Sequence, residues 1–261
     1  NVCLPIIPAL IVAGLVAAAF AALIGAPVLR LKSDYFAIAT LGFAEVVRIV
    51  VASSPLNRIT NGSLGLNSIP SFKSYYAIFA VVIICIAIMA LIKKSTYGRA
   101  FKAIRDDEIA AEAMGINLAK HKMLSFIISS FFAGIGGALL AMYLKAVSAT
   151  TFTISTATYY ILLMVVIGGM GSFTGSIIAS MLVIFSKEWW LRFLDAPLSI
   201  NGFNVPLLRP GFRMVIFSII LMIVVLFFRG GIMGDREFSW DGIAQFFKNF
   251  GKKKEEVRKD G

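Results

Sequence analysis

Long apolar runs alternate with short polar segments along the whole chain. The runs that approach or exceed the length of a membrane span lie at about 4–29, 35–52, 75–92, 123–143, 152–169, 173–190 and 212–228. A helix needs roughly 20 apolar residues to cross the hydrocarbon core of a bilayer. A membrane β-barrel is excluded, because its strands alternate polar with apolar residues over about 10 positions. The pattern therefore predicts an all-α, polytopic transmembrane helical bundle with about seven spans.

A cluster of glycines separates the fifth run from the sixth. Residues 154–185 are apolar enough for one long helix, but their centre holds Gly168, Gly169, Gly171 and Gly175. Each glycine costs a helix about 1 kcal/mol relative to alanine. We therefore predict a turn here. We expect Gly168, Gly169 and Gly171 to act as a hinge or in close helix packing, which is the commoner use of small residues in membranes.

The basic residues indicate how the spans are oriented. Segment 93–122 and the tail from Arg229 are the two most basic parts of the chain, and cytoplasmic loops carry an excess of lysine and arginine. Both lie inside only if an even number of spans joins them, which requires the turn at the glycine cluster. This orientation also puts interface-favouring aromatic residues at the outer boundary, namely Tyr75, Tyr76, Tyr143, Trp189 and Trp190. The chain then begins outside with Asn1, so we expect further helices upstream of it.

Composition narrows the kinds of partner. The chain of 261 residues is 59% hydrophobic, and its formal net charge of +11 concentrates in one loop and one tail. We therefore expect a lipid bilayer, and no nucleic acid, to be the partner of this charge. Cys3 and Cys85 lie in apolar runs, and His121 has no cysteine or acidic cluster at ligand spacing. A metal site or other cofactor is not expected.

The last part of the chain, 235–261, is predicted to be a cytoplasmic tail. It carries Trp240, Ile243, Phe247 and Phe250 at helical spacing, followed by Lys252, Lys253 and Lys254. That spacing predicts a helix lying on the inner membrane surface, with its lysines facing anionic lipid. A disordered end is the alternative for the last ten or so residues.

The charged loop at 93–122 contains several residue patterns that are typical of helices and of helix ends. Lys102 with Asp106, and Arg105 with Glu108, have the spacing of ion pairs on a helix surface. Gly115 suits the end of a helix, and the next helix is expected to begin near residue 117. The run Ala110, Ala111, Ala113 and Met114 forms a slim face, with Glu112 as its one charged contact, that fits a groove on a partner. The alternative is a solvated loop that serves only to orient the spans.

Two further segments are candidates for a translocation path. Glu45 and Arg48 share one helix face near the outer end of the second span, where an ion pair lowers the cost of two charges in a membrane. A satisfied ion pair is favoured there over a direct role in translocation. Thr40 to Gly42 is a candidate break in that helix, of the kind that lines transporter cavities. The segment Asn61 to Gly65 is either a plain turn or an outer loop that meets a substrate or a delivering protein.

Several segments carry a resemblance to a known family. They are Tyr97-Gly98-Arg99-Ala100 through Ala111-Glu112-Ala113-Met114-Gly115-Ile116-Asn117, residues 29–43 with Glu45 and Arg48 following, and residues 61–66, 166–172 and 228–234. Together they resemble the LivM-type branched-chain amino acid permeases of ABC importers, with the cytoplasmic EAA-type coupling loop of that class. Thr60-Asn61-Gly62 replaces a more usual Thr-Gly-Gly, and Arg229-Gly230-Gly231 replaces a sequence containing Arg-Pro. Both departures lie in connecting segments.

The resemblance implies a permease subunit of a bacterial ABC importer in the cytoplasmic membrane, with residues 1–234 as the permease domain. It implies a second, homologous but non-identical permease, two cytoplasmic ATPase subunits and an extracytoplasmic substrate-binding protein. The chain contains no Gly-Lys-Ser or Gly-Lys-Thr, so we expect separate subunits to hydrolyse ATP and this chain not to be an enzyme. A single helix over 97–116 would convert ATPase closure into an alternating-access change.

The candidate residues fall into three groups. They are Arg99, Ala111, Glu112, Ala113 and Gly115 for coupling to the ATPase, then Thr40, Gly42, Glu45, Asn61, Gly62 and Gly65 for the translocation path, and Gly168, Gly169 and Gly171 for a hinge or packing. A permease for urea or short amides is an alternative within the same family. A stand-alone secondary transporter or channel is an alternative of another class, disfavoured because few titratable residues lie in the spans. An intramembrane enzyme has no supporting group of residues.

Overall fold

The computed structural model describes most of the chain up to residue 186. The described residues are 5–31, 33–53, 55, 60–72, 75–153, 157–169, 171–186, 189, 199–200, 203–204, 215–216, 219 and 222. The chain divides into two compact units, Asn1–Thr153 and Ile154–Gly261. Each unit is described below by itself.

Helices make up nearly all of the regular structure. The first unit contains α1 (Ile6–Val28), α2 (Ser33–Ala52), η2 (Gly62–Leu64), β1 (Leu66–Asn67), α4 (Tyr75–Lys94), α5 (Thr96–Asp106), α6 (Glu108–Ala113), α7 (Leu118–Leu144), β2 (Ala146–Val147) and η3 (Ala149–Phe152). The second unit contains α8 (Tyr159–Gly168), α9 (Phe173–Phe185), β3 (Ser199–Ile200) and β4 (Phe203–Asn204). The predicted all-α membrane bundle is confirmed.

Four of the described helices, α1, α2, α4 and α7, are long and apolar enough to cross a membrane. They agree with the first four predicted spans to within a few residues, because each follows an uninterrupted apolar run. Helix α7 begins at Leu118, as expected, several residues before its apolar run, because the side chain of Asn117 accepts a hydrogen bond from the Lys120 amide, 3.0 Å away, and caps the helix. Helix α2 runs without a break through Thr40 and Gly42, so a broken helix at that point is wrong.

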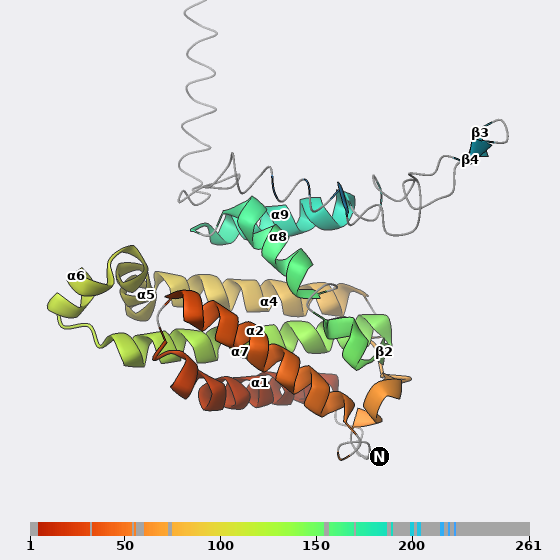
Figure 1. Ribbon diagram of the computed structural model, residues 1–261, viewed down its shortest axis with the longest axis horizontal. Coiled ribbons are helices and arrows are strands. Elements are labelled where there is room, and N and C mark those ends of the chain that lie inside the picture. The colour runs from red at the N-terminus through yellow and green to blue at the C-terminus, as the bar shows by residue number, and fades with distance from the viewer. Residues whose placement is uncertain are drawn as a thin grey trace, which may run out of the picture. The chain divides into compact units, whose positions relative to one another are not determined.

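In the first unit, α1 and α7 pack along each other while α2 crosses obliquely (Figure 1). Small residues allow the close approach of α1 and α7: a Cβ built on Gly134 would lie 2.6 Å from the Cβ of Ala17. A core cluster of Leu10, Ile135 and Met142 fills the space between them, with Val81 and Cys85 of α4 packed against it. The chain thus holds its helices together through backbone proximity and apolar contacts.

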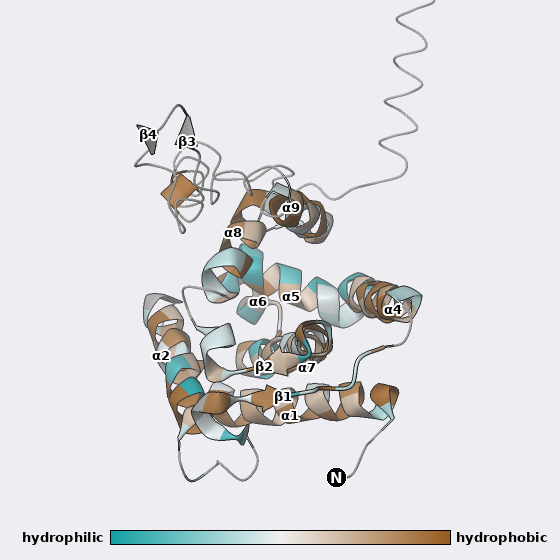
Figure 2. Ribbon diagram, turned by 90° about the vertical axis from the view of Figure 1, so that its right-hand side faces the viewer, coloured by the Kyte–Doolittle hydropathy of each residue, from teal (hydrophilic) through white to brown (hydrophobic). Residues whose placement is uncertain are grey.

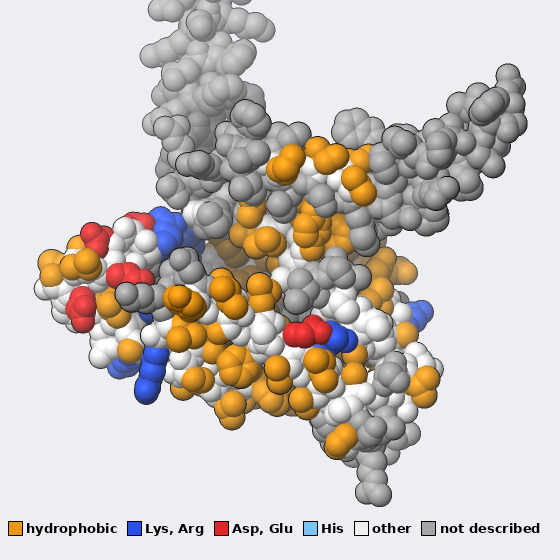
Figure 3. Space-filling view, viewed as in Figure 1, with side chains coloured by type: hydrophobic (Ala, Val, Ile, Leu, Met, Phe, Trp, Pro, Cys, Tyr) orange, Lys and Arg blue, Asp and Glu red, His pale blue; other side chains and the backbone are white. Residues whose placement is uncertain are grey.

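Apolar residues predominate along the long helices of this bundle (Figure 2), and many of their side chains are exposed. Side chains such as Phe20, Ile83 and Leu23 are 56%, 63% and 72% exposed. Charged side chains gather instead at the end that carries α5 and α6 (Figure 3). Soluble monomers rarely expose large contiguous apolar patches, so this surface is suited to lipid or to partner membrane helices.

A short antiparallel pairing closes the opposite end of the bundle. Leu66 of β1 pairs with Val147 of β2, and Asn67 pairs with Ala146. The Ile69 amide also donates to the carbonyl of Lys145, at 3.1 Å. These bonds tie the segment that follows α2 to the end of α7, and they fix the turn that precedes β1.

The second unit confirms the turn at the glycine cluster but not the predicted lengths of the two flanking spans. Helices α8 and α9 have 10 and 13 residues, which is about 15 and 20 Å at 1.5 Å per residue, against roughly 30 Å for the hydrocarbon core. The fifth predicted span was expected to start at 152, but residues 149–152 form η3 after the polar N-cap Ser148. As described, neither helix has the length of a span.

The turn between α8 and α9 brings two glycines into contact. Gly168 lies against Gly175 and Ser176, where a Cβ on Gly168 would come within 2.6 Å of backbone atoms. Gly169 makes the turn with φ +100°, Gly171 follows within it, and Ser172 caps α9 by accepting from the Gly175 amide at 3.0 Å. This geometry is that of close packing. A hinge role for these glycines remains a prediction.

Some predictions lie outside the described residues. Of the predicted span 212–228, only residues 215, 216, 219 and 222 are described, and they are helical. The surface helix predicted from Trp240 onward and the rest of the tail 235–261 fall entirely outside.

Candidate translocation cavity and coupling loop

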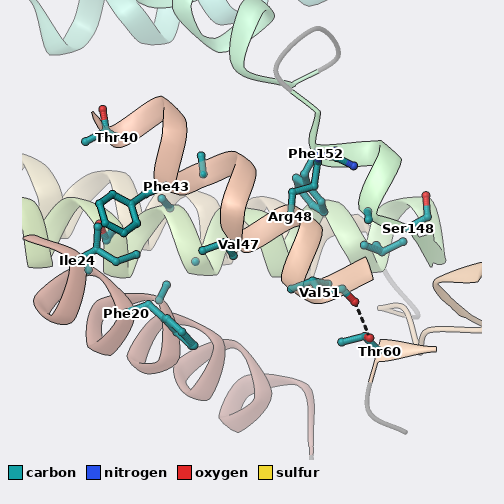
Figure 4. A pocket seen from close by; sticks show the side chains of 18 of the residues that line it. Phe20, Ile24, Thr40, Phe43, Val47, Arg48, Val51, Thr60, Ser148 and Phe152 are labelled. Atoms are coloured by element: carbon teal, nitrogen blue, oxygen red, sulfur yellow. Dashed lines mark hydrogen bonds between the residues drawn. The ribbon is translucent and has the colours of Figure 1, made fainter. Parts of the chain in front are cut away.

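A cavity of about 600 Å³ opens between α1, α2, α7 and the segments at the β1–β2 end. Its walls are mainly apolar: Phe20 and Ile24 come from α1, and Phe43 and Val47 come from α2 (Figure 4). The volume lies in the range of small-molecule sites, which are mostly apolar with a few polar groups that orient the ligand. We call this space the upper cavity.

A small set of polar side chains interrupts the apolar lining. Thr40, Arg48, Thr60, Ser130 and Ser148 supply it. The hydroxyl of Thr40 donates to the α2 backbone, at 3.0 Å from the carbonyl of Phe36 or 2.9 Å from that of Ala37. The hydroxyl of Thr60 donates to the carbonyl of Val51 at 2.8 Å, which fastens the start of the 60–65 segment to the end of α2 (Figure 4).

Arg48 and Glu45 form the predicted ion pair on α2. The Nε of Arg48 donates to both Glu45 carboxylate oxygens, at 2.9 and 3.0 Å, and its Nη2 also contacts Oε1. The two side chains are 26% and 37% exposed. Since Arg48 also lines the upper cavity, the pair is more than a neutralised charge on a lipid-facing surface: it places a guanidinium at the cavity wall.

The segment from Thr60 to Gly65 is a compact turn over one side of the upper cavity. Asn61 has left-handed backbone angles, with φ 56°, and its side-chain amide donates to the Gly65 carbonyl at 3.1 Å. The Leu64 amide returns to the Asn61 carbonyl at 3.2 Å. Gly62 and Gly65 are buried and line the cavity. This is a structured turn whose backbone faces the cavity.

The predicted path residues are therefore only partly brought together. Thr40, Gly62 and Gly65 line the upper cavity, and Glu45 reaches it only through Arg48. Asn61 braces the turn from an exposed position, and Gly42 is exposed on α2 with open space beside it. Their role in translocation remains a prediction.

Sequence reasoning missed several lining residues. Phe126 and Ser130 of α7 and Phe152 of η3 line the cavity, yet no motif marks them. The run of hydroxyl residues from Ser148 to Thr153 was a usable signal, because it interrupts two apolar stretches at the position where the chain turns over the cavity.

The loop 93–122 forms two helices, α5 and α6, where a single helical segment was expected. The break falls at Asp107, whose backbone is extended and whose carboxylate accepts from the amides of Ile109 at 2.9 Å and Ala110 at 3.1 Å. An aspartate that caps α6 in this way competes with continuation of α5. Ser95 caps α5 by accepting from the Gly98 amide at 3.4 Å.

Helix α6 presents most of its surface to solvent. Ala111 is buried, whereas Glu112 and Ala113 are exposed and Ile109 and Met114 are each 82% exposed. The helix ends as predicted at Gly115, which has φ +84°, a conformation open to glycine at no steric cost. The amide of the following residue closes the turn on the Ala111 carbonyl at 3.1 Å.

One ion pair joins the loop to the bundle, and another lies within the loop. The pairs expected from spacing, Lys102 with Asp106 and Arg105 with Glu108, stay predictions. Glu108 of α6 pairs with Lys122 of α7 at 2.6 Å, and Arg105 pairs with its neighbour Asp106 at 2.8 Å. Arg99 lies exposed on α5 and donates to the hydroxyl of Thr96 at 3.1 Å. The Glu108–Lys122 contact is notable because it joins the loop to a membrane helix.

Comparison with known proteins agrees with these features. Residues 1–226 match the family described as "Branched-chain amino acid transport system / permease component". The chain is similar to the high-affinity branched-chain amino acid transport system permease protein LivM of Escherichia coli (strain K12), with 34% identity over 220 residues that cover 71% of this chain and 50% of the relative. It is also similar to LivM of Salmonella typhimurium, with 33% identity over 220 residues that cover the same shares. No solved structure matches the chain.

A more distant relative supports the same family. The probable branched-chain amino acid transport permease protein LivM of Methanocaldococcus jannaschii is 27% identical over 181 residues, which cover 65% of this chain and 52% of the relative. The chain spans about half the length of these curated relatives. The resemblance found in the sequence motifs is confirmed, and the chain belongs to the family of permease components of branched-chain amino acid transport systems.

Proposed function

We propose that this chain is a permease subunit of an ATP-driven importer for branched-chain or similar hydrophobic amino acids in the bacterial cytoplasmic membrane. The observation that carries the proposal is the α5–α6 element. It stands at the charged end of an otherwise apolar bundle, exposes the tip of α6, and is tied to the membrane helix α7 by Glu108 and Lys122. Such an element can receive motion from a soluble partner and pass it to the spans.

The upper cavity fits a small zwitterion with an apolar side chain. Aromatic and aliphatic residues of α1 and α2 supply most of its wall, while Arg48 and the Gly62–Gly65 turn supply polar groups at one side. A ligand of this chemistry buries its side chain against the apolar wall and keeps its charged end near the guanidinium and the turn.

The coupling step is assigned to α6. Ile109 and Met114 are exposed apolar side chains at the two ends of the helix, and Glu112 is a charged side chain between them. An apolar helix face with a single charged contact is suited to a groove on a partner. The partners are two cytoplasmic ATPase subunits, with a second homologous permease beside this chain and a substrate-binding protein outside. The name of the M. jannaschii relative LivH, 27% identical over 160 residues, supports a second permease type within the family.

A charge reversal on α6 tests this assignment. Glu112→Lys should leave the chain in the membrane, because the residue is exposed, but should abolish co-purification of the ATPase subunits and ATP-dependent leucine uptake. Asp106→Lys is the matched control: it makes the same change of charge in the same loop, at a side chain 63% exposed, and should keep both. Normal uptake by Glu112→Lys would contradict the docking role of α6.

A further inference from the structure

A second cavity, of about 960 Å³, lies at the charged end of the first unit. Its lining combines Arg30 and Leu31 after α1, Glu108 of α6, and Lys122 and Ser129 of α7. In contrast to the upper cavity, it presents charges of both signs next to the coupling loop. We call this space the vestibule.

The two cavities follow one another along the same three helices. On α1, residues 17–24 line the upper cavity and residues just beyond the helix line the vestibule. On α2, which runs in the opposite direction, Thr40 to Val51 line the former and Phe36 lines the latter. On α7, Phe126 contributes to both. Phe126 is therefore part of the boundary between them.

The ring of Phe126 is held between the other two helices at this boundary. It meets the ring of Phe36 on α2 edge to face, with centroids 6.3 Å apart and planes at 75°. The ring also contacts α1 at Gly25, where an added Cβ would sit 3.0 Å from Cδ1 of the ring. A larger side chain at position 25 would displace the ring of Phe126, so glycine at this position leaves room for the ring.

We propose that Phe126, closed against Phe36 and Gly25, is the inner gate of this permease. The inference rests on the proposed transport function and adds the residue that separates the substrate cavity from the cytoplasmic vestibule. An apolar constriction blocks the passage of water and polar solutes without a covalent or ionic lock. A substrate with an apolar side chain crosses it when the two rings separate.

The coupling loop has a direct connection to this gate. Lys122, which pairs with Glu108 of α6 at 2.6 Å, lies one helical turn before Phe126, so both project from the same face of α7. A displacement of α6 therefore pulls on the turn of α7 that carries the gate. Movement of Phe126 away from Gly25 and Phe36 would join the two cavities.

The gate is tested by the accessibility of a cysteine placed just above it. Ser130 lies one turn beyond Phe126 and lines the upper cavity, whereas Ser129 lines the vestibule. The complex, with Cys3 and Cys85 of this chain replaced by serine, is assayed in inside-out native membrane vesicles with a membrane-impermeant methanethiosulfonate reagent. We expect Ser129→Cys to react rapidly and Ser130→Cys to react slowly while Phe126 is intact.

Truncation of the gate should remove that difference. Phe126→Ala should raise the labelling rate of Ser130→Cys several-fold, and Phe126→Trp, which keeps a large ring, should leave it slow. The matched control is Phe132→Ala, which removes a ring from the same helix; that ring packs on Phe131, at a centroid distance of 5.5 Å, and lines neither cavity. It should also leave the rate slow.

Two results would overturn the gate. One is a Ser130→Cys rate equal to that of Ser129→Cys with Phe126 intact, and the other is no change of rate in Phe126→Ala. The labelling does not depend on the substrate, so it can be separated from the proposed function. Absence of leucine uptake by the unmodified complex would refute the importer, whereas intact uptake with an unaffected labelling rate would refute only the gate.

Discussion

Replacement of Gly134 by alanine tests the close packing of α1 and α7 at the wall of the upper cavity. In the structure an added Cβ at this position lies 2.6 Å from the Cβ of Ala17, 2.8 Å from the Ala13 carbonyl oxygen and 3.1 Å from the Cα of Gly14. Carbon atoms in ordinary contact are about 3.5–4.0 Å apart. The methyl group is therefore about 1 Å too close to α1, and the backbone atoms opposite it cannot rotate away.

The magnitude follows from two opposing terms. Glycine to alanine in a helix gains about 1 kcal/mol of intrinsic propensity, and overpacking of a close interface costs about 1–3 kcal/mol. The same substitution at Gly136, on the same helix, meets no heavy atom within 4 Å and should show the gain alone. The free energy of unfolding of Gly134→Ala should thus fall below that of Gly136→Ala by about 1–3 kcal/mol.

The measurement is equilibrium denaturation of the purified chain in mild detergent micelles, followed by far-ultraviolet circular dichroism. Gly137→Ala provides a second control, since it too meets open space. Equal stabilities at positions 134, 136 and 137 would refute the close crossing of α1 and α7. Because Gly134 also lines the upper cavity, leucine uptake should fall in Gly134→Ala and not in the two controls.

Two further predictions concern ion pairs. Arg48→Leu or Glu45→Leu alone leaves one unpaired charge in α2, at an insertion cost of about 2.5–3.5 kcal/mol. Each single variant should therefore insert less efficiently than the double variant, as measured by the membrane-embedded fraction of a glycosylation-tagged chain. Equal insertion of all three variants would contradict a structural role for the pair. Glu108→Lys should weaken the coupling of ATP hydrolysis to leucine uptake, because the new lysine repels Lys122. Adding Lys122→Glu in the same chain should restore the coupling. If the charge swap does not restore it, the ion pair does not carry motion from α6 to α7.

The parts of the fold that were predictable from sequence are those encoded locally. Apolar runs placed α1, α2, α4 and α7, because burial in lipid requires each run to be about one membrane thickness long. Gly115 and Asn117 marked the end of α6 and the start of α7, because backbone angles and caps are properties of single residues. The i,i+3 spacing likewise anticipated the Glu45–Arg48 pair.

The parts that were not predictable depend on residues distant in sequence. Ala17 and Gly134 meet at the wall of the upper cavity, and nothing in either segment indicates its partner. In the sequence, Phe126 is one more apolar residue of a span, and only the structure shows that its ring contacts Phe36 and Gly25. The break at Asp107 was missed for another reason. The charged residues on both sides of it have helical spacing, whereas the break depends on the single carboxylate of Asp107, which caps α6 and so competes with continuation of α5.

The most direct test of the whole account is transport by the complex purified from its native membrane and reconstituted in proteoliposomes. We predict that this chain co-purifies with an ATPase and a second permease, and that leucine uptake requires ATP and the binding protein and is not displaced by urea. Purification of the chain alone with ATP-independent flux would make it a stand-alone carrier and contradict the account. Uptake of urea in place of leucine would contradict the assigned substrate.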